Sequence, residues 1–206
     1  MKKALIFDLD NTIYPVPSIG AKLFEPVFKK IEESGAHNDD LEEIKKDMMR
    51  IPFQKVAEEY DFDEKLQEDC IKLLQELTYD EPMQAFEDFE RMRSLPVDRF
   101  LVTTGFMKMQ QSKVKALELE KDFKEIFIID PMVNDKQKKD IFQEIVDKYK
   151  YNKSEVLVIG DDLDSEIKGA TELGIDTVYY DKNKQQPGAE ATYIISNFDE
   201  LKLDED

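Results

Sequence analysis

Residues 1–14 read MKKALIFDLDNTIY, a short apolar run followed by two carboxylates. The run, residues 4–7, has the length and composition of a buried β-strand. Asp8 and Asp10 follow it with one apolar residue between them, so on an extended chain their side chains point to the same side. Two carboxylates that leave water together repel each other unless a cation joins them, and oxygen ligands suit Mg²⁺. A strand that ends in an ordinary polar turn explains this stretch equally well.

The composition places the chain among folded proteins of ordinary size. Its 206 residues allow one large domain, or a medium domain with an insert, and a core that needs no crosslinks. Its one cysteine, Cys70, excludes an intrachain disulfide, and no apolar run has the length of a membrane span. No secretory leader is recognisable in the opening residues. We therefore expect a cytoplasmic protein.

The charge balance argues against polyanionic partners. Forty-seven acidic residues face 29 basic ones, a formal net charge of −18. Such a surface repels nucleic acid polymers and anionic membranes, so we expect neither as a partner. A small phosphorylated ligand would need a local reversal of charge by a metal, a lysine or backbone N–H groups. The composition does not distinguish a monomer from a dimer.

The hydrophobic pattern divides the chain into two kinds of structure. Residues 16–81 contain no convincing strand and predict helices at residues 21–34, from Asp39-Asp40 to about residue 52, at 53–60 and from 63 onward, after a turn at 15–20. A further helix is expected to open at Pro82. Strands are then predicted at 97–103, 126–129, 155–159, 177–180 and 192–195, and helices at 107–119, 135–151 and 165–173.

This alternation predicts the fold class. Strands that alternate with helices form a parallel α/β sheet, here a Rossmann-like core with helices on both faces. We assign residues 1–15 and 82–206 to this core and residues 16–81 to a small all-helical insert.

Reactive side chains recur where the predicted strands end. One predicted strand ends in Thr103-Thr104-Gly105. The next leads into a helix that opens at residues 134–136, with Lys136, and a third is followed by Asp161-Asp162 and Glu166. Each group also has a simple structural explanation: a turn, a solvated helix start or a helix cap. Because ligands of parallel α/β sheets bind beyond the carboxyl ends of the strands, their coincidence with Asp8 and Asp10 predicts one common site.

These motifs resemble those of the haloacid dehalogenase superfamily, in its phosphatase branch. Asp8-Leu9-Asp10-Asn11-Thr12 is similar to the first motif, DxDxT, and the strand that ends at Thr103 to the second. Lys136, six residues before Phe142, is similar to the third, and residues 160–166 to the fourth. The chain departs from the family pattern in Glu166, which replaces an Asp, and in Gln137, which replaces a Pro and leaves Lys138 as an alternative lysine.

The resemblance implies a metal-dependent phosphoryl transfer. Asp8 would attack phosphorus and form an aspartyl-phosphate, and Asp10 would protonate the leaving group and later deprotonate water. Mg²⁺ would be held by the Asp8 side chain, the Asp10 backbone carbonyl and Asp161. Glu166 and Asp162 would contact it from a second layer or through water.

The resemblance also implies contacts to the substrate. Thr103 would bind a phosphoryl oxygen, and Lys136 would place a cation beside Asp8 and the phosphate. Backbone N–H groups around Leu9-Asp10 and Thr104-Gly105 would complete the phosphate cradle, and Tyr14 would lie near the substrate.

The insert resembles the mobile cap of the family, which closes over the site. The run DNTIYP, residues 10–15, is similar to that of the pyrimidine 5′-nucleotidase-like members, so a nucleoside monophosphate or a sugar phosphate is expected as substrate. A sugar-phosphate mutase and a non-catalytic regulatory binding module remain alternatives. A phosphonate-cleaving enzyme would need a cap lysine, for which Lys22, Lys29 and Lys30 are available. His37 is expected on the surface without a catalytic role.

Overall fold

The computed structural model describes residues 1–36 and 40–203 of the chain, so the expectations for His37 and Asp39 lie outside the described residues. Its centre is a six-stranded sheet in the order β3-β2-β1-β4-β5-β6, and every neighbouring pair is parallel. The strands are β1 (Ala4–Phe7), β2 (Asp98–Thr104), β3 (Glu125–Ile129), β4 (Val156–Gly160), β5 (Asp176–Tyr180) and β6 (Tyr193–Ile195). The predicted α/β fold class is confirmed.

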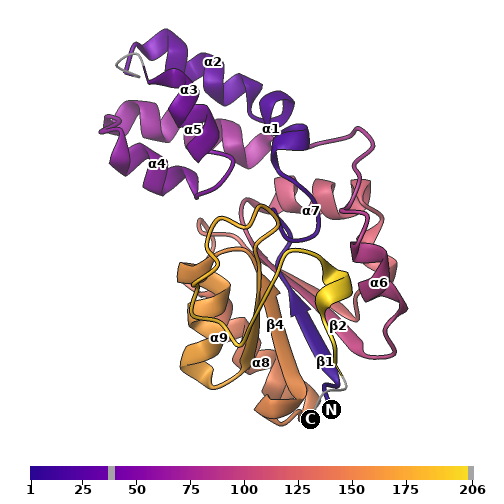
Figure 1. Ribbon diagram of the computed structural model, residues 1–206. Helices are drawn as coiled ribbons and strands as arrows, with labels where there is room; N and C mark the ends of the chain where they lie inside the picture. Colours follow the sequence, from indigo (N-terminus) through magenta and orange to yellow (C-terminus); the bar gives the residue numbers. More distant parts are fainter. Residues whose placement is uncertain (37–39, 204–206) are drawn as a thin grey trace.

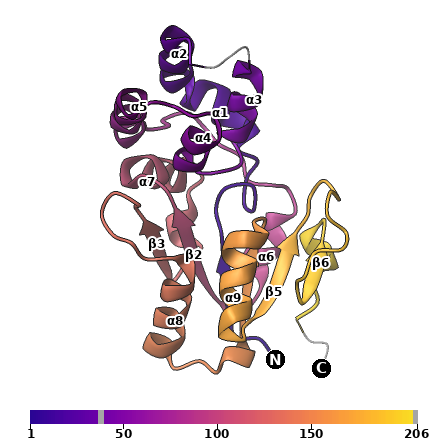
Figure 2. The ribbon, with the colours of Figure 1, turned by 90° about the vertical axis from the view of Figure 1, so that its left-hand side faces the viewer.

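Strand β1 is the central strand because its side chains are apolar on both faces. Leu5 and Phe7 belong to a core that includes residues of α6 (Phe89–Ser94) and α7 (Met107–Ala116). Ala4 and Ile6 pack on the other face, with α8 (Lys138–Tyr149) and α9 (Lys168–Leu173). Figure 2 shows α8 and α9 in front of the sheet. The strand order reverses beside β1, where open α/β sheets bind their ligands.

The insert forms a separate group of helices beyond the carboxyl ends of the strands (Figure 1). It consists of α1 (Pro17–Leu23), α2 (Glu25–Ser34), α3 (Leu41–Asp47), α4 (Phe53–Glu59) and α5 (Glu64–Glu76). Its core includes the buried stripe Leu66, Cys70 and Leu74, as the spacing predicted. Across residues 1–36 and 40–203, no helix is both long and apolar enough to cross a membrane.

Several predicted boundaries are wrong, each beside a proline or a helix end. Pro17 begins α1 within the expected turn, and Phe24 then separates α1 from α2, because proline is well suited to the first turn of a helix. The helix expected at Pro82 begins only at Phe89. Helix α9 is preceded by one π-helical turn, Leu163–Ile167, and short 3₁₀ turns occupy Leu119–Lys121, Lys153–Glu155 and Phe198–Glu200.

A buried carboxylate connects the end of β5 to the C-terminal segment. Asp88 accepts hydrogen bonds from the Tyr180 hydroxyl (2.9 Å), the Phe198 N–H (2.9 Å) and the Lys182 ammonium (3.1 Å). Burial by itself raises the pKa of Asp88, but these three donors lower it below the usual 3.8. The contacts stabilise the ionised form, so their contribution to folding is present above the carboxyl's usual pKa and is lost as the pH falls through its lowered value.

We predict that Asp88→Asn lowers the free energy of unfolding by about 1–3 kcal/mol at pH 7, because the buried Tyr180 hydroxyl, the Phe198 N–H and the exposed Lys182 lose one charged acceptor. The difference from the wild type should shrink as the pH falls below about 4, where the native carboxyl is protonated too. Urea denaturation at several pH values measures both effects. Asp199→Asn, an exposed carboxylate of the same segment, is the control and should change stability little. An equal loss at pH 7 and pH 3 would contradict this account.

Candidate active site

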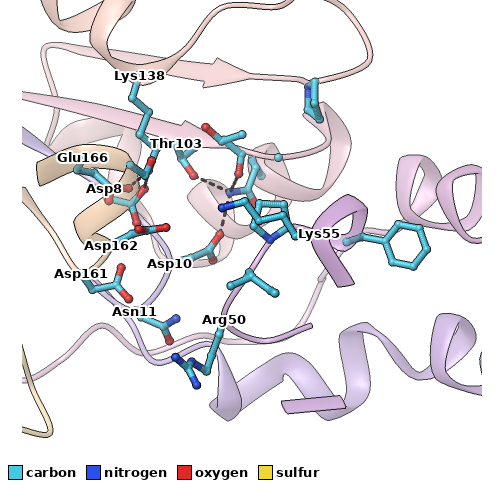
Figure 3. Close-up of a pocket in the computed structure, with 18 of the residues that line it drawn as sticks. Asp8, Asp10, Asn11, Arg50, Lys55, Thr103, Lys138, Asp161, Asp162 and Glu166 are labelled. Carbon is cyan, nitrogen blue, oxygen red and sulfur yellow. Dashed lines mark hydrogen bonds and ion pairs between the residues drawn. The ribbon is translucent and has the colours of Figure 1, made fainter. Parts of the chain in front are cut away.

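A cavity of about 620 Å³ lies between the carboxyl ends of the strands and the insert. Asp8, which directly follows β1, is buried on its floor, and its N–H donates to the Ile159 carbonyl of β4 at 3.0 Å. Asp10, Thr103, Thr104, Gly105, Asp161, Asp162 and Glu166 also line the cavity. The strand ends selected from the sequence thus meet at one place (Figure 3).

The lysine beside Asp8 is Lys138, which corrects the expectation for Lys136. The Lys138 ammonium lies 2.5 Å from an Asp8 carboxylate oxygen and also bonds Glu166. Lys136 lines the cavity, but its exposed side chain pairs with Glu144. Burial by itself lowers the pKa of Lys138, but Asp8 and Glu166 raise it well above its usual value, so the group is an ammonium.

The start of helix α8 explains this choice. Gln137 is the N-cap and forms a reciprocal capping box with Asp140, which makes Lys138 the first helical residue. Lys138 then lies three, four and seven residues before the buried Ile141, Phe142 and Ile145, on the face that turns to the sheet. This spacing is visible in the sequence. The distance of the family's motif lysine from the later phenylalanine instead indicated Lys136, two residues earlier.

Glu166 is packed against Gly160 at the end of β4. A Cβ atom on Gly160 would lie 2.7 Å from the Glu166 Cγ, so only glycine leaves room for this side chain. One Glu166 oxygen bonds Lys138, while the other, Oε2, is buried without a hydrogen-bond partner among the described residues. An unsatisfied carboxylate oxygen at this place indicates that a further polar or cationic group belongs there.

Asp161 adds a second carboxylate close to Asp8. Burial, and then repulsion from Asp8 and Glu166, raises the pKa of Asp161. Among the described residues its side chain accepts one hydrogen bond, a long one from the Thr12 hydroxyl at 3.4 Å. Asp162 instead caps the next helical turn by accepting from the Asp164 N–H at 2.8 Å. The helix-cap interpretation therefore applies to Asp162 and not to Asp161.

Asp10 has a separate set of buried partners. The Lys113 ammonium lies 2.8 Å from its Oδ1, the Gln110 amide donates to Oδ2 at 3.0 Å, and the Tyr14 hydroxyl donates to Oδ1. All three side chains are almost completely buried. Burial by itself raises the pKa of Asp10, but Lys113, Tyr14 and Gln110 lower it below its usual value. Asp10 is thus held as a carboxylate, in contrast to Asp8, whose pKa burial raises.

Sequence reasoning missed Gln110 and Lys113, although a signal was present. Both lie on the buried face of α7 together with Met109 and Val114. Two polar side chains on an otherwise apolar helical face need buried partners. The partner, Asp10, is about a hundred residues away, so only the fold identifies it.

Two further expectations change in detail. Tyr14 is fully buried and does not line the cavity, and its hydroxyl holds Asp10, while its place near the substrate stays a prediction. Thr103 is buried, and its hydroxyl oxygen accepts from the Gln110 amide at 2.6 Å. Thr104 and Gly105 line the cavity as expected. Leu9 is fully buried, so only its backbone is available to a phosphate.

The carboxylates could hold a cation through only a few protein ligands. Within residues 1–36 and 40–203, no group of three or more His, Cys, Asp or Glu side chains is arranged as a metal site. The donor set expected from the sequence needs fewer side chains, because it combines two carboxylates, Asp8 and Asp161, with the backbone carbonyl of Asp10. The raised pKa values of Asp8 and Asp161 and the unpartnered Glu166 oxygen fit a cation held there.

The family follows from a comparison over most of the chain. Residues 5–180 match the model of the haloacid dehalogenase-like hydrolase family. This chain belongs to that family. The resemblance seen in the motifs is confirmed, and the chain is a hydrolase by family.

Similar curated proteins have phosphatase names. A glyceraldehyde 3-phosphate phosphatase of Methanopyrus kandleri is 26% identical over 208 residues, covering 90% of this chain and 87% of that protein. A ribulose-1,5-bisphosphate 5-phosphatase of Halopiger xanaduensis is 24% identical over 216 residues, with 93% and 90% covered. A pyrimidine 5′-nucleotidase of Streptococcus pneumoniae is 25% identical over 107 residues, only 50% of this chain and 45% of that protein.

A solved structure supports the fold. The magnesium-bound structure of YfnB from Bacillus subtilis, described as a HAD-hydrolase, superimposes with a TM-score of 0.62 at 21% identity. It covers 97% of this chain and 96% of that one. At this identity the likeness concerns the fold alone.

We predict that Lys138→Met is far more destabilising than Lys136→Met. Removal of Lys138 leaves Asp8 and Glu166 buried without a cation, which typically costs about 3–5 kcal/mol. The exposed Lys136–Glu144 pair contributes about 0–1 kcal/mol. Urea denaturation without added metal measures both variants, and Lys138→Met/Glu166→Gln should recover part of the loss. Equal effects of the two lysine variants would contradict the assignment of Lys138.

Proposed function

We propose that this protein is a Mg²⁺-dependent phosphomonoesterase that hydrolyses a small phosphorylated metabolite through an aspartyl-phosphate. One observation carries the proposal: Asp8 and Asp10 line the same cavity, but each has a different buried lysine. Two carboxylates with different environments can take two different roles in a reaction. The phosphatase names of the relatives support the same class of reaction.

The residues present fit the metal. Asp8 and Asp161, with the Asp10 backbone carbonyl, would hold Mg²⁺, and Glu166 and Asp162 would contact it from farther away. Bound there, Mg²⁺ would neutralise charge between the carboxylates and an incoming phosphate. Lys138 contributes a second positive charge beside Asp8, which favours the phosphate in a chain of net charge −18.

The first half of the reaction transfers the phosphoryl group to Asp8. An Asp8 oxygen forms a bond to phosphorus while the bond from phosphorus to the ester oxygen breaks, and Asp10 gives its proton to the leaving alkoxide. Because Asp10 is a carboxylate in this structure, it must gain a proton first. It takes this proton from solvent, and the proton that it accepts from water in the second half restores the acid for the next turnover.

The second half returns Asp8 to its starting form. Asp10 accepts a proton from water, the water oxygen attacks phosphorus, and the Asp8–phosphorus bond breaks to release inorganic phosphate. The lowered pKa of Asp10 favours the carboxylate, which is the form that accepts a proton in this step. Thr103 and the backbone around Thr104-Gly105 would bind phosphoryl oxygens.

Residues 16–81 would act as the cap of the core formed by residues 1–15 and 82–206. The insert supplies the far wall of the cavity through Met48, Phe53 and Leu74, whose apolar side chains help to exclude water. Lys22, Lys29 and Lys30 are each paired with a carboxylate and do not line the cavity, so the geometry does not favour a Schiff-base reaction.

A sugar phosphate is the favoured kind of substrate. The two relatives named for glyceraldehyde 3-phosphate and ribulose 1,5-bisphosphate match nine-tenths of this chain, whereas the nucleotidase matches half of it. A cavity of about 620 Å³ has room for more than a phosphate group.

We predict that the protein releases inorganic phosphate from sugar phosphates with Mg²⁺ and loses this activity in EDTA. Asp8→Asn should lower turnover by roughly 10³-fold or more, because the nucleophile is removed. Phosphate release from a panel of phosphomonoesters measures both effects, with Asp199→Asn as the control. Full turnover in Asp8→Asn would contradict the assignment of the nucleophile. Isomerised sugar phosphates without phosphate release would identify a mutase, and no reaction with any ester a binding module.

We predict that Lys113→Met is sensitive to the leaving group. The variant lacks the ammonium that fixes the Asp10 carboxylate in place, so Asp10 is no longer held beside the departing oxygen and protonation of that oxygen should become slow. The kcat/KM for an alkyl phosphate should fall about 10- to 100-fold more than that for p-nitrophenyl phosphate, whose leaving group needs no proton. The ratio is measured on one protein sample, so a general loss of folded protein cancels. An equal decrease for both esters would contradict this role.

A further inference from the structure

The cavity contains cations that are not used by the proposed chemistry. Arg50 and Lys55 lie on the loop between α3 and α4 and at the start of α4, on the insert side of the cavity. Figure 3 shows both well apart from Lys138 and Asp8. The cavity therefore has positive groups beside the nucleophile and, on the insert, at Arg50 and at Lys55, which Figure 3 shows apart from each other.

Arg50 and Lys55 have no partner of their own. Within residues 1–36 and 40–203, neither side chain forms a hydrogen bond or an ion pair. Burial raises the pKa of Tyr179 on β5, and Arg50 only partly opposes this rise. The contrast is with the other lysines of the cavity, Lys113, Lys136, Lys138 and Lys139, which each pair with a carboxylate. In a chain with 47 acidic residues, unpaired cations on a cavity wall are unexpected. Lys168, on the core side, is the third such cation of the cavity.

The loop that carries Arg50 is anchored by contacts of the residues on either side of Arg50. The Met49 carbonyl accepts a hydrogen bond from the Asn11 amide at 3.3 Å, directly after the Asp8-Leu9-Asp10 segment. The Met49 side chain is packed against Gly20, where a Cβ atom would lie 2.7 Å from its sulfur. The Arg50 and Ile51 N–H groups both donate to the Asp47 carbonyl at 2.8 Å. Arg50 is therefore held over the cavity by anchored backbone on both sides.

Resting on the proposed function, we propose that Arg50 and Lys55 bind a second anionic group of the substrate, a phosphate or a carboxylate at the end away from the transferred phosphate. Lys138 already serves the transferred phosphate, and apolar lining residues such as Met48, Phe53 and Leu74 are available to the carbon chain. An unpaired guanidinium and an ammonium are the usual ligands of phosphate and carboxylate groups. The substrate class is then a doubly anionic phosphorylated metabolite, such as a sugar bisphosphate or a phosphorylated acid.

Matched pairs of esters test this proposal. The pairs are ribulose 1,5-bisphosphate with ribulose 5-phosphate, and 3-phosphoglycerate with glycerol 3-phosphate. The wild type should have the higher kcat/KM for the doubly anionic member of at least one pair. In Arg50→Gln/Lys55→Gln this preference should fall about tenfold to a hundredfold, the range for a lost charged hydrogen bond. Lys115→Gln removes an exposed, unpaired lysine outside the cavity and is the matched control. Lys168→Gln should leave the preference in place.

Binding separates this proposal from the proposed function. In the Asp8→Asn background, calorimetry should show tighter binding of the doubly anionic member, and the double variant should abolish the difference. If the wild type hydrolyses no ester but this binding difference is present, the proposed function fails and the anion site stands. Equal losses for both members of a pair, no loss in the double variant, or equal binding of both members would overturn the anion site.

Discussion

The structure depends on buried lysines that neutralise the carboxylates brought together by the fold. Asp8, Asp10, Asp161 and Glu166 come from two neighbouring strand ends and meet at the carboxyl edge of the sheet. Repulsion in a buried place would favour their protonation or local unfolding. The side chains of Lys138 on α8 and Lys113 on α7 are almost completely buried, and their positive charges offset this repulsion. The two lysines therefore divide one acidic cluster into two halves with different protonation behaviour.

This division gives the two aspartates of the first motif their different properties. Burial raises the pKa of Asp8, and repulsion from Glu166 and Asp10 adds to this effect while Lys138 opposes it, whereas three donors lower the pKa of Asp10. The difference arises from helices α7 and α8, which lie on opposite faces of the sheet. A nucleophile beside a proton carrier requires such an asymmetry, because two equivalent carboxylates could not take separate roles.

The insert is joined to this centre by few but well-placed contacts. The chain passes from Asp10 through the buried Ile13 and Tyr14 into α1, and the Asn11 amide binds the Met49 carbonyl of the insert. The Tyr79 N–H donates to the Ser112 hydroxyl of α7 near the return to the core. The segment that orients Asp10 is thus the same segment that positions the wall of the cavity. Changes in the insert can therefore reach the reacting groups through one short stretch of chain.

The sequence by itself determined the α/β sheet, the helical insert and the carboxylates of the cavity, because strand periodicity and the motif at Asp8 and Asp10 are local patterns. It also indicated the family, which the comparison over residues 5–180 confirmed. Only the tertiary structure decided that Lys138 replaces Lys136, that Tyr14 supports Asp10, and that Gln110 and Lys113 belong to the site. Apart from the Tyr14–Asp10 contact, which spans four residues, these facts depend on side chains that meet across a hundred residues of chain or more. A local pattern places a residue on a buried face, but the packing of helices on the sheet selects its partner.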